Sequence, residues 1–146
     1  MEMVAHFPNS SSTNMTWNSN RFWSIRELNF FGTSFNSSIP SSFGYLHELR
    51  NLDLSNDNLF SGVIPENLFN CSFLIGLYLS DNNISDKIPR WLGNLSFLEH
   101  ITMPNNHLEG PILVEFCQPD SLQILDILEN NLSRSLPFCF SPLSIR

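Results

Sequence analysis

Apolar residues recur along this chain at intervals of about two dozen residues, from Ile25 to the C-terminus. Five segments of nearly equal length align on their first apolar residue, and these starts are Ile25, Leu49, Leu74, Leu98 and Leu122. The third and fifth residues after each start are also apolar, as are Leu77 and Leu79 in the third segment. A polar residue stands at the eighth position and another apolar residue follows two positions later, which gives the shared pattern LxxLxLxxNxL.

The alternation of apolar and polar residues within each LxxLxL stretch predicts a short strand with one buried face. The expected strands lie near residues 26–30, 50–54, 75–79, 99–103 and 123–127. One such unit cannot bury its apolar face alone, whereas stacked neighbours form a continuous core. We therefore predict an α/β fold, a right-handed leucine-rich-repeat solenoid. Short parallel strands should line its concave face, with loops and short 3-10 or helical turns on its convex face.

The polar eighth position marks the place where the chain turns out of each strand. It holds Thr33, Asp57, Asn82, Asn106 and Asn130. An asparagine amide that faces inward can hydrogen-bond backbone groups of its own turn and of the adjacent turn, which buried backbone requires. Because Thr33 and Asp57 depart from asparagine, we expect this ladder to be weaker in the first two repeats.

The second half of four of the five repeats carries an apolar residue followed by proline, as in Ile64-Pro65 and Ile88-Pro89, whereas the fourth repeat has Leu113 in place of the proline. Gly62 and Gly110 stand two residues before the apolar position, which gives the sense of LxGxIP. Proline fixes φ and lacks a donor, so we expect extended or turn segments at these positions, followed by a short convex helical turn. The repeat that begins at Leu49 holds one extra residue, which we place between Leu59 and Pro65.

LxGxIPxxLxxL after LxxLxLxxN resembles the plant-specific class of leucine-rich repeats. This class occurs in receptor-like kinases, in receptor-like proteins without a kinase, and in polygalacturonase inhibitors. The run from Gly76 to Ile112, with EFC at 115–117 and LPFCF at 136–140, is most similar to plant receptor-like proteins. The resemblance covers residues 25–146 and implies an extracellular module for recognition in defence or development, without catalysis. Proteins of this family lie at the extracellular face of the plasma membrane.

Residues 1–24 are rich in Asn, Ser and Thr, and we interpret them as an irregular leader or a degenerate repeat. Shifting the repeat back by one full period puts Val4 at a leucine position. At the other end, the sequence stops where a sixth strand is expected to begin. The N-terminus lacks the apolar run of a signal peptide, and no stretch approaches the ~18 apolar residues needed to cross a bilayer.

Seven Asn-x-Ser/Thr sequons suggest a secreted glycoprotein: Asn9, Asn14, Asn36, Asn70, Asn83, Asn94 and Asn131. The candidate glycosylation sites within the repeats are Asn36, Asn70, Asn83, Asn94 and Asn131. The alternative is that an Asn- and Ser-rich sequence produces sequons by chance. The sequons suggest secretion, yet the sequence shows neither an export signal nor an anchor. Both observations are explained if the chain is a fragment of a longer ectodomain or a truncated gene product.

The three cysteines predict no metal site, because they form no C-x-x-C pair and no histidine stands at ligand spacing. Cys71 falls on an inward position and is expected to be a buried free thiol. Cys117 and Cys139 lie on the convex side of adjacent turns, so geometry permits a disulfide, although their separation falls slightly short of a full repeat. The carboxylates are spread along the strands and no nucleophile motif surrounds the serines, which favours a protein that is not an enzyme and needs no cofactor.

Solvent-facing strand positions form a candidate binding surface, the concave lane. Its members are Arg26, Glu27, Phe31, Arg50, Asp53, Tyr78, Asp81, Glu99, His100, Asp126 and Glu129. Six carboxylates against two arginines favour a basic peptide or protein ligand, and Tyr78 and Phe31 offer aromatic anchors. The alternative for each residue is that it is simply a solvated strand position. The net charge of −7 argues against nucleic acid and anionic membrane surfaces as partners.

Three functions remain open on the sequence alone. The first is a receptor ectodomain segment that captures a ligand on the concave lane and leaves signalling to a co-receptor kinase. The second is a soluble inhibitor of a pathogen enzyme, of the polygalacturonase-inhibitor type. The third is a truncated fragment without a function of its own.

Overall fold

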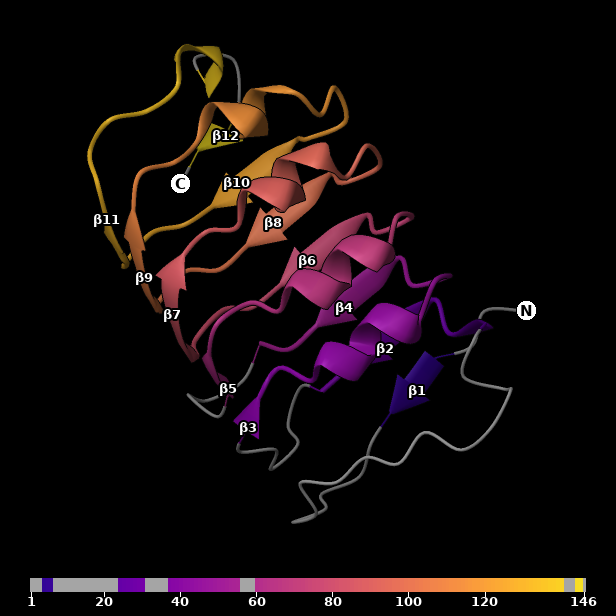
Figure 1. Cartoon of the computed structure of the whole chain (residues 1–146). Helices are drawn as coiled ribbons and strands as arrows, with labels where there is room; N and C mark the ends of the chain where they lie inside the picture. The colour runs from indigo at the N-terminus through magenta and orange to yellow at the C-terminus, as the bar shows by residue number, and fades with distance from the viewer. Residues whose placement is uncertain (1–3, 7–23, 31–36, 56–59, 141–143, 146) are drawn as a thin grey trace.

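The computed structural model describes residues 4–6, 24–30, 37–55, 60–140 and 144–145 of the 146-residue chain. The repeats stack one upon another in chain order, so the colour in Figure 1 runs steadily from one end of the molecule to the other. Two parallel sheets and a column of short 3-10 helices form the walls of this solenoid, and the predicted leucine-rich-repeat fold is confirmed.

The larger sheet has seven parallel strands in the order β1-β2-β4-β6-β8-β10-β12. They are β1 (Val4–His6), β2 (Glu27–Asn29), β4 (Asn51–Asp53), β6 (Gly76–Tyr78), β8 (His100–Thr102), β10 (Ile124–Asp126) and β12 (Ser144–Ile145). The five predicted strands are all present, each one residue shorter at both ends. The register pairs the central leucine-type residues across the sheet: Leu28, Leu52, Leu77, Ile101 and Leu125.

The two end strands lie in registers that differ from the expected ones. Ala5, and not Val4, pairs with Leu28, so the first strand is displaced by one position from the repeat spacing. Ile145 pairs with Leu125, and the connection between them is shorter than a full repeat. The expectation that the sequence stops before a sixth repeat strand is therefore wrong, because this shorter connection brings β12 onto the sheet within the chain.

A second sheet, which the sequence pattern did not predict, follows the turn after each concave strand. Its order is β11-β9-β7-β5-β3. The strands are β3 (Ser37–Ser38), β5 (Phe60–Gly62), β7 (Asn83–Lys87), β9 (His107–Gly110) and β11 (Asn131–Leu132). Gly62 and Gly110 adopt φ of +80° and +78° there, and Asp86 has φ of 71° at the equivalent position. The glycine of LxGxIP thus permits a left-handed residue at the end of the strand.

The extra residue of the second repeat lies elsewhere than the sequence pattern predicted. Phe60 is 1% exposed and precedes Ile64 by four residues, as Ile84 precedes Ile88. Phe60 lies six positions after Leu54, whereas Ile84 lies five positions after Leu79. The extra residue therefore precedes Phe60, because the buried position keeps its spacing to Ile64.

Short 3-10 helices form the convex side, as predicted. They are η2 (Ser41–Tyr45), η3 (Glu66–Asn70), η4 (Arg90–Asn94), η5 (Val114–Cys117) and η6 (Phe138–Phe140). Pro40, Pro65 and Pro89 precede the first three in an extended conformation, and Leu113 takes that place before η5. None of the helices in the described part of the chain has the length and the apolar character needed to span a membrane.

The core between these walls is held by apolar side chains and by a ladder of buried asparagines. Asn82 is 1% exposed. Its Nδ2 donates to the carbonyl oxygens of Leu54 at 2.8 Å and Leu79 at 3.1 Å, and its Oδ1 accepts from the Phe60 amide at 3.0 Å. Asn106 and Asn130 repeat the arrangement one and two repeats later. The predicted role of this position is confirmed, and Thr33 and Asp57 lie outside the described residues.

Candidate functional site

The structure places the described members of the concave lane on the solvent-facing side of the larger sheet or at its edge. Glu27, Asp53, Tyr78, His100 and Asp126 lie on the strands next to the buried leucine-type residues, as the pleat requires, whereas Arg26, Arg50 and Glu99 directly precede strands. The half-buried members are Arg26, Glu27, Asp53, Tyr78, Glu99, His100 and Asp126. Arg50, Asp81 and Glu129 are exposed, and Phe31 lies outside the described residues.

Two polar contacts, each between a pair of neighbouring strands, lie at the centre of the lane. Asn51 on β4 donates from Nδ2 to Oε1 of Glu27 on β2 at 2.7 Å. The hydroxyl of Tyr78 on β6 shares a 3.0 Å hydrogen bond with Nδ1 of His100 on β8. The register pairs Glu27 directly with Asn51, whereas it pairs Tyr78 with Thr102 and Gly76 with His100, so the Tyr78 side chain reaches His100 diagonally.

Gly76 makes this arrangement possible, and the repeat pattern alone does not single it out. A Cβ at Gly76 would lie 2.5 Å from Oδ1 of Asn51 and 2.6 Å from Cε2 of Tyr78. The Tyr78 ring therefore lies across the bare backbone of its own strand on the way to His100. A glycine inside a strand often marks such a close approach, and that signal was present in the sequence.

Negative charge surrounds the Tyr78 hydroxyl. Burial of the ring raises the pKa of Tyr78, and the carboxylates of Asp53, Glu27 and Glu99 raise it further. Each of these effects disfavours the phenolate. The hydroxyl thus stays protonated at neutral pH and can donate or accept a hydrogen bond in the centre of an acidic surface.

A row of left-handed residues borders the lane where the chain leaves the strands. Asp81, Asn105 and Glu129 hold equivalent places in successive repeats, with φ of 58°, 55° and 54°. Asn105 donates from Nδ2 to Oδ1 of Asp81 at 2.7 Å. The exit turns therefore present polar side chains in a fixed order along one edge of the sheet.

The described sequon asparagines lie outside the concave lane. Asn70 and Asn94 are the last residues of η3 and η4, and Asn83 and Asn131 belong to strands of the second sheet. All four are exposed. Asn36 lies outside the described residues, and glycosylation stays a prediction from the sequence at all five sites.

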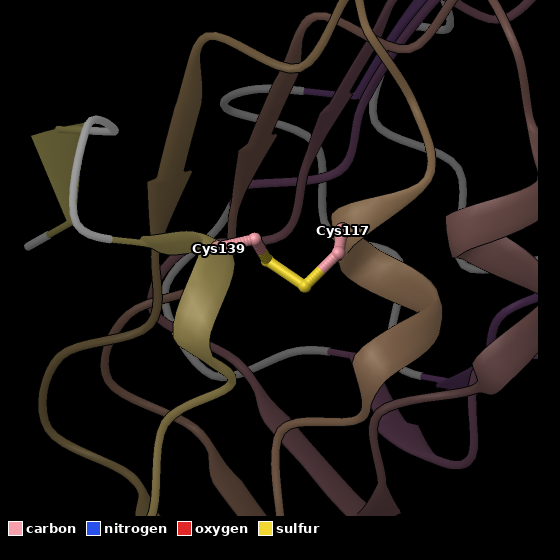
Figure 2. Close-up of a disulfide and its surroundings, with 2 residues drawn as sticks. All are labelled: Cys117 and Cys139. Atoms are coloured by element: carbon pink, nitrogen blue, oxygen red, sulfur yellow. A yellow bond between two sulfur atoms is a disulfide. The ribbon is translucent and has the colours of Figure 1, made fainter.

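Two of the three cysteines are joined. A disulfide links Cys117 in η5 to Cys139 in η6, with the Cα atoms 5.5 Å apart, inside the range expected for such a bond (Figure 2). Cys71 is a buried free thiol that donates to the carbonyl oxygen of Phe43 at 3.4 Å. Burial raises the pKa of Cys71 to about 12, which keeps this thiol neutral. Within the described ranges, no three His, Cys, Asp or Glu side chains gather where they could hold a metal ion.

Two leucine-rich-repeat family models match the chain, one over residues 24–46 and the other over residues 47–108. Together they cover more than half of its 146 residues. The chain belongs to the leucine-rich-repeat family. No curated protein sequence matches it significantly.

Solved structures of plant receptor ectodomains share its fold. The plant peptide hormone receptor RGFR1, in complex with RGF2, is 31% identical with a TM-score of 0.75, over 99% of this chain and 22% of that one. PEPR1 with AtPEP1 is 30% identical with a TM-score of 0.77, over 84% and 18%. The Arabidopsis receptor kinase HAESA, with an extended IDA peptide hormone, is 29% identical with a TM-score of 0.74, over 79% and 19%. The chain is thus a leucine-rich-repeat segment of the plant receptor type, and it spans about a fifth of the length of these ectodomains.

Proposed function

We propose that this chain is a ligand-recognition segment of a plant receptor-like protein and that it binds a peptide or protein on its concave lane. The observation that carries this proposal is the pair of polar contacts Glu27–Asn51 and Tyr78–His100, with the aromatic ring of Tyr78 lying over Gly76. Tyrosine combines a large apolar ring with a hydrogen-bonding tip, a combination enriched where proteins meet.

The charge of the lane favours a ligand with basic groups. Glu27, Asp53 and Glu99 all act on the Tyr78 hydroxyl, so their negative potential converges at the centre of the surface. A Lys or Arg side chain arriving there would meet complementary charge, which increases the association rate and the specificity of binding. The described sequons leave this face unobstructed.

The cellular setting is part of the same proposal. A disulfide such as Cys117–Cys139 persists in oxidising compartments, which supports an extracellular location at the plasma membrane surface. HAESA has been solved together with a peptide hormone and the co-receptor SERK1. By analogy, this segment binds without catalysis and without a cofactor, and signalling passes to a co-receptor kinase in defence or development.

Peptide arrays test the proposal directly. Two libraries of equal length and apolar content are immobilised, one carrying Lys and Arg and the other Asp and Glu. We expect the chain to bind the basic library, with weaker binding at high salt because exposed charges are screened. Tyr78→Ala and Asp126→Ala should each weaken binding, and loss of the central ring should cost about tenfold or more in Kd, or ~1.4 kcal/mol.

Lys87→Ala and Arg90→Ala provide the matched controls, because both residues are exposed and lie on β7 and η4, away from the lane. These variants should bind as the unmodified chain does. Equal losses from both sets of variants would exclude a concave site.

A further inference from the structure

An open hollow of about 270 Å³ lies on the convex side, between the end of η4 and the turn that follows η5. Its lining residues are Gly93, Asn94, Ser96, Gln118, Pro119 and Asp120. None of them belongs to the concave lane. The hollow is therefore separate from the surface proposed above for ligand recognition.

A single substitution in the repeat pattern accounts for this hollow. The inward position after each convex helix holds Leu46, Cys71 and Leu95, which are 4%, 0% and 2% exposed. The next repeat holds Pro119 at this position, and Pro119 is only half-buried. The compact proline ring does not fill the space of a leucine side chain, so the surface is recessed there.

The lining suits a sugar better than a peptide or an apolar ligand. Asn94, Ser96, Gln118 and Asp120 offer amide, hydroxyl and carboxylate groups from exposed side chains, whereas Gly93 and Pro119 contribute apolar surface. A pyranose ring with an acetamido group carries hydroxyls, an amide and an apolar face, and matches each of these. The volume lies just below the ~300 Å³ at which ligand pockets usually begin, which fits one monosaccharide.

The chain itself can supply that sugar. Asn94, which lines the hollow, is the first residue of the sequon Asn94-Leu95-Ser96, and both Asn94 and Ser96 are exposed. We propose that Asn94 carries an N-linked glycan whose first N-acetylglucosamine occupies this hollow. The proposal rests on the extracellular location proposed above, since the modification takes place in the secretory pathway.

The covalent step needs a lipid-diphosphate-linked oligosaccharide as co-reactant. A bond forms between Nδ2 of Asn94 and the anomeric carbon of the first sugar. The bond from that carbon to the lipid diphosphate breaks, and the diphosphate leaves with the electron pair while the amide gives up one proton. The disulfide at Cys117, directly before Gln118, forms in the same oxidising route and fixes one wall of the hollow.

Asn70 provides a matched control because it holds the same position one repeat earlier and is equally an exposed sequon. The turn beside it contains the buried Leu95 in place of Pro119. A glycan on Asn70 therefore faces a filled surface. The two glycosylation sites therefore differ in whether a hollow lies beside the asparagine.

The test uses the whole chain, secreted from plant cells behind an added leader. Peptide mass spectrometry should find Asn94 occupied. Under native conditions, a peptide amidase for N-glycans should release the Asn94 glycan about tenfold more slowly than the Asn70 glycan, a factor equal to ~1.4 kcal/mol. Asn94→Gln should lower Tm by ~2–4 °C, a shift that Asn70→Gln should not produce. Pro119→Leu, which fills the hollow, should bring the Asn94 release rate to that of Asn70.

These experiments can contradict the proposal about the hollow without contradicting the proposed ligand binding at the concave lane. The proposal that a sugar fills the hollow would be overturned if Asn94 carried no glycan while Asn70 did, or if the two glycans were released at equal rates. Neither result would bear on ligand binding at the concave lane. Secreted protein without a glycan at either site would overturn the proposal that a sugar fills the hollow, and it would remove the sequons as support for an extracellular origin. Neither result depends on peptide binding, which the array experiment measures separately.

Discussion

Single residues at fixed repeat positions tie the turns of this solenoid together. Asn82, Asn106 and Asn130 each donate to carbonyls of two repeats and accept from the backbone amide of the preceding one. A buried polar group left without its partner costs about 1–3 kcal/mol, more than the net gain from a hydrogen bond that is made. Loss of the asparagine side chain should therefore destabilise the exit turn, because buried backbone groups would lose their hydrogen-bond partner.

Asn106→Ala should destabilise the fold by about 2–4 kcal/mol, because it leaves the Ile84 amide without its partner, removes one of the two hydrogen bonds that the Leu79 carbonyl oxygen accepts, and opens a small cavity. Denaturant unfolding of bacterially produced, unglycosylated protein measures this. Asn70→Ala at an exposed position should stay within ~0.5 kcal/mol of the parent. A midpoint for Asn106→Ala equal to that of Asn70→Ala would show that water replaces the ladder without cost.

Tyr78 should titrate later than an ordinary tyrosine, since burial and the carboxylates of Asp53, Glu27 and Glu99 raise its pKa. The folded state then holds this proton more tightly than the unfolded chain, so the contribution to stability is complete below pH ~10 and is lost as pH rises through the folded pKa. Absorbance titration in a Tyr45→Phe background isolates the signal. Asp53→Asn should lower the pKa of Tyr78, whereas Asp120→Asn, on the far side of the molecule from the lane, should not change it.

At the scale of elements, the concave strands follow directly from the sequence and the second sheet does not. Period-two alternation around Leu52, Leu77 and Ile101 marks half-buried strands, and the structure has them. In β7 the alternation is interrupted at Asp86, which lies two residues after Ile84 and takes a left-handed conformation. The strand is instead defined by its pairing with neighbouring repeats. No local pattern records those partners.

The two polar contacts of the lane also show which features the sequence predicts and which it does not. Its residue types and positions could be predicted, because the regular repeat spacing assigns each one to a strand and a face. The contact of Tyr78 with His100 could not, since it depends on the missing side chain of Gly76 and on the rotamer of the ring. Sequence periodicity places residues side by side and leaves the direction of their side chains open.

The disulfide between η5 and η6 should hold the last described convex turns together. Cys139→Ser should cost about 3 kcal/mol, the value expected for opening a loop of this length. Hydrogen exchange should show lost protection in β11 and little change in β4 and β6, which lie several repeats away. Uniform loss of protection over the whole chain would mean that the solenoid unfolds as one unit and that the bond acts globally.

At the scale of the whole molecule, the last described repeat presents apolar surface that inner repeats cover. Leu136 is 53% exposed, whereas the residues at its position in the preceding repeats, Ile64, Ile88 and Ile112, are 5%, 2% and 6% exposed. Repeat proteins bury such surface under a terminal unit with a polar outer face. This chain matches only about a fifth of the length of the solved ectodomains that resemble it.

The chain expressed alone should associate in a concentration-dependent manner, because exposed apolar surface and strand edges promote self-assembly. A polar capping repeat appended after residue 146 should raise Tm by several degrees and yield a monomer. Light scattering and thermal melts of the two forms measure this. A bare chain that stays monomeric and melts as high as the capped one would contradict the role given to the exposed end.

The parallel register of the larger sheet also determines which residues of an extended peptide ligand meet equivalent positions of the lane. Neighbouring strands lie ~4.8 Å apart, whereas an extended peptide advances ~3.3 Å per residue. Two strand steps, ~9.6 Å, therefore match three peptide residues, ~9.9 Å, so a peptide laid across the strands meets equivalent lane positions on β4 and β8 with every third side chain. Repeats of one parity would inspect one set of ligand positions and repeats of the other parity a different set. Lane residues on the two sets of repeats can then change independently, so one surface can recognise two sets of ligand residues while the leucines beneath it stay the same.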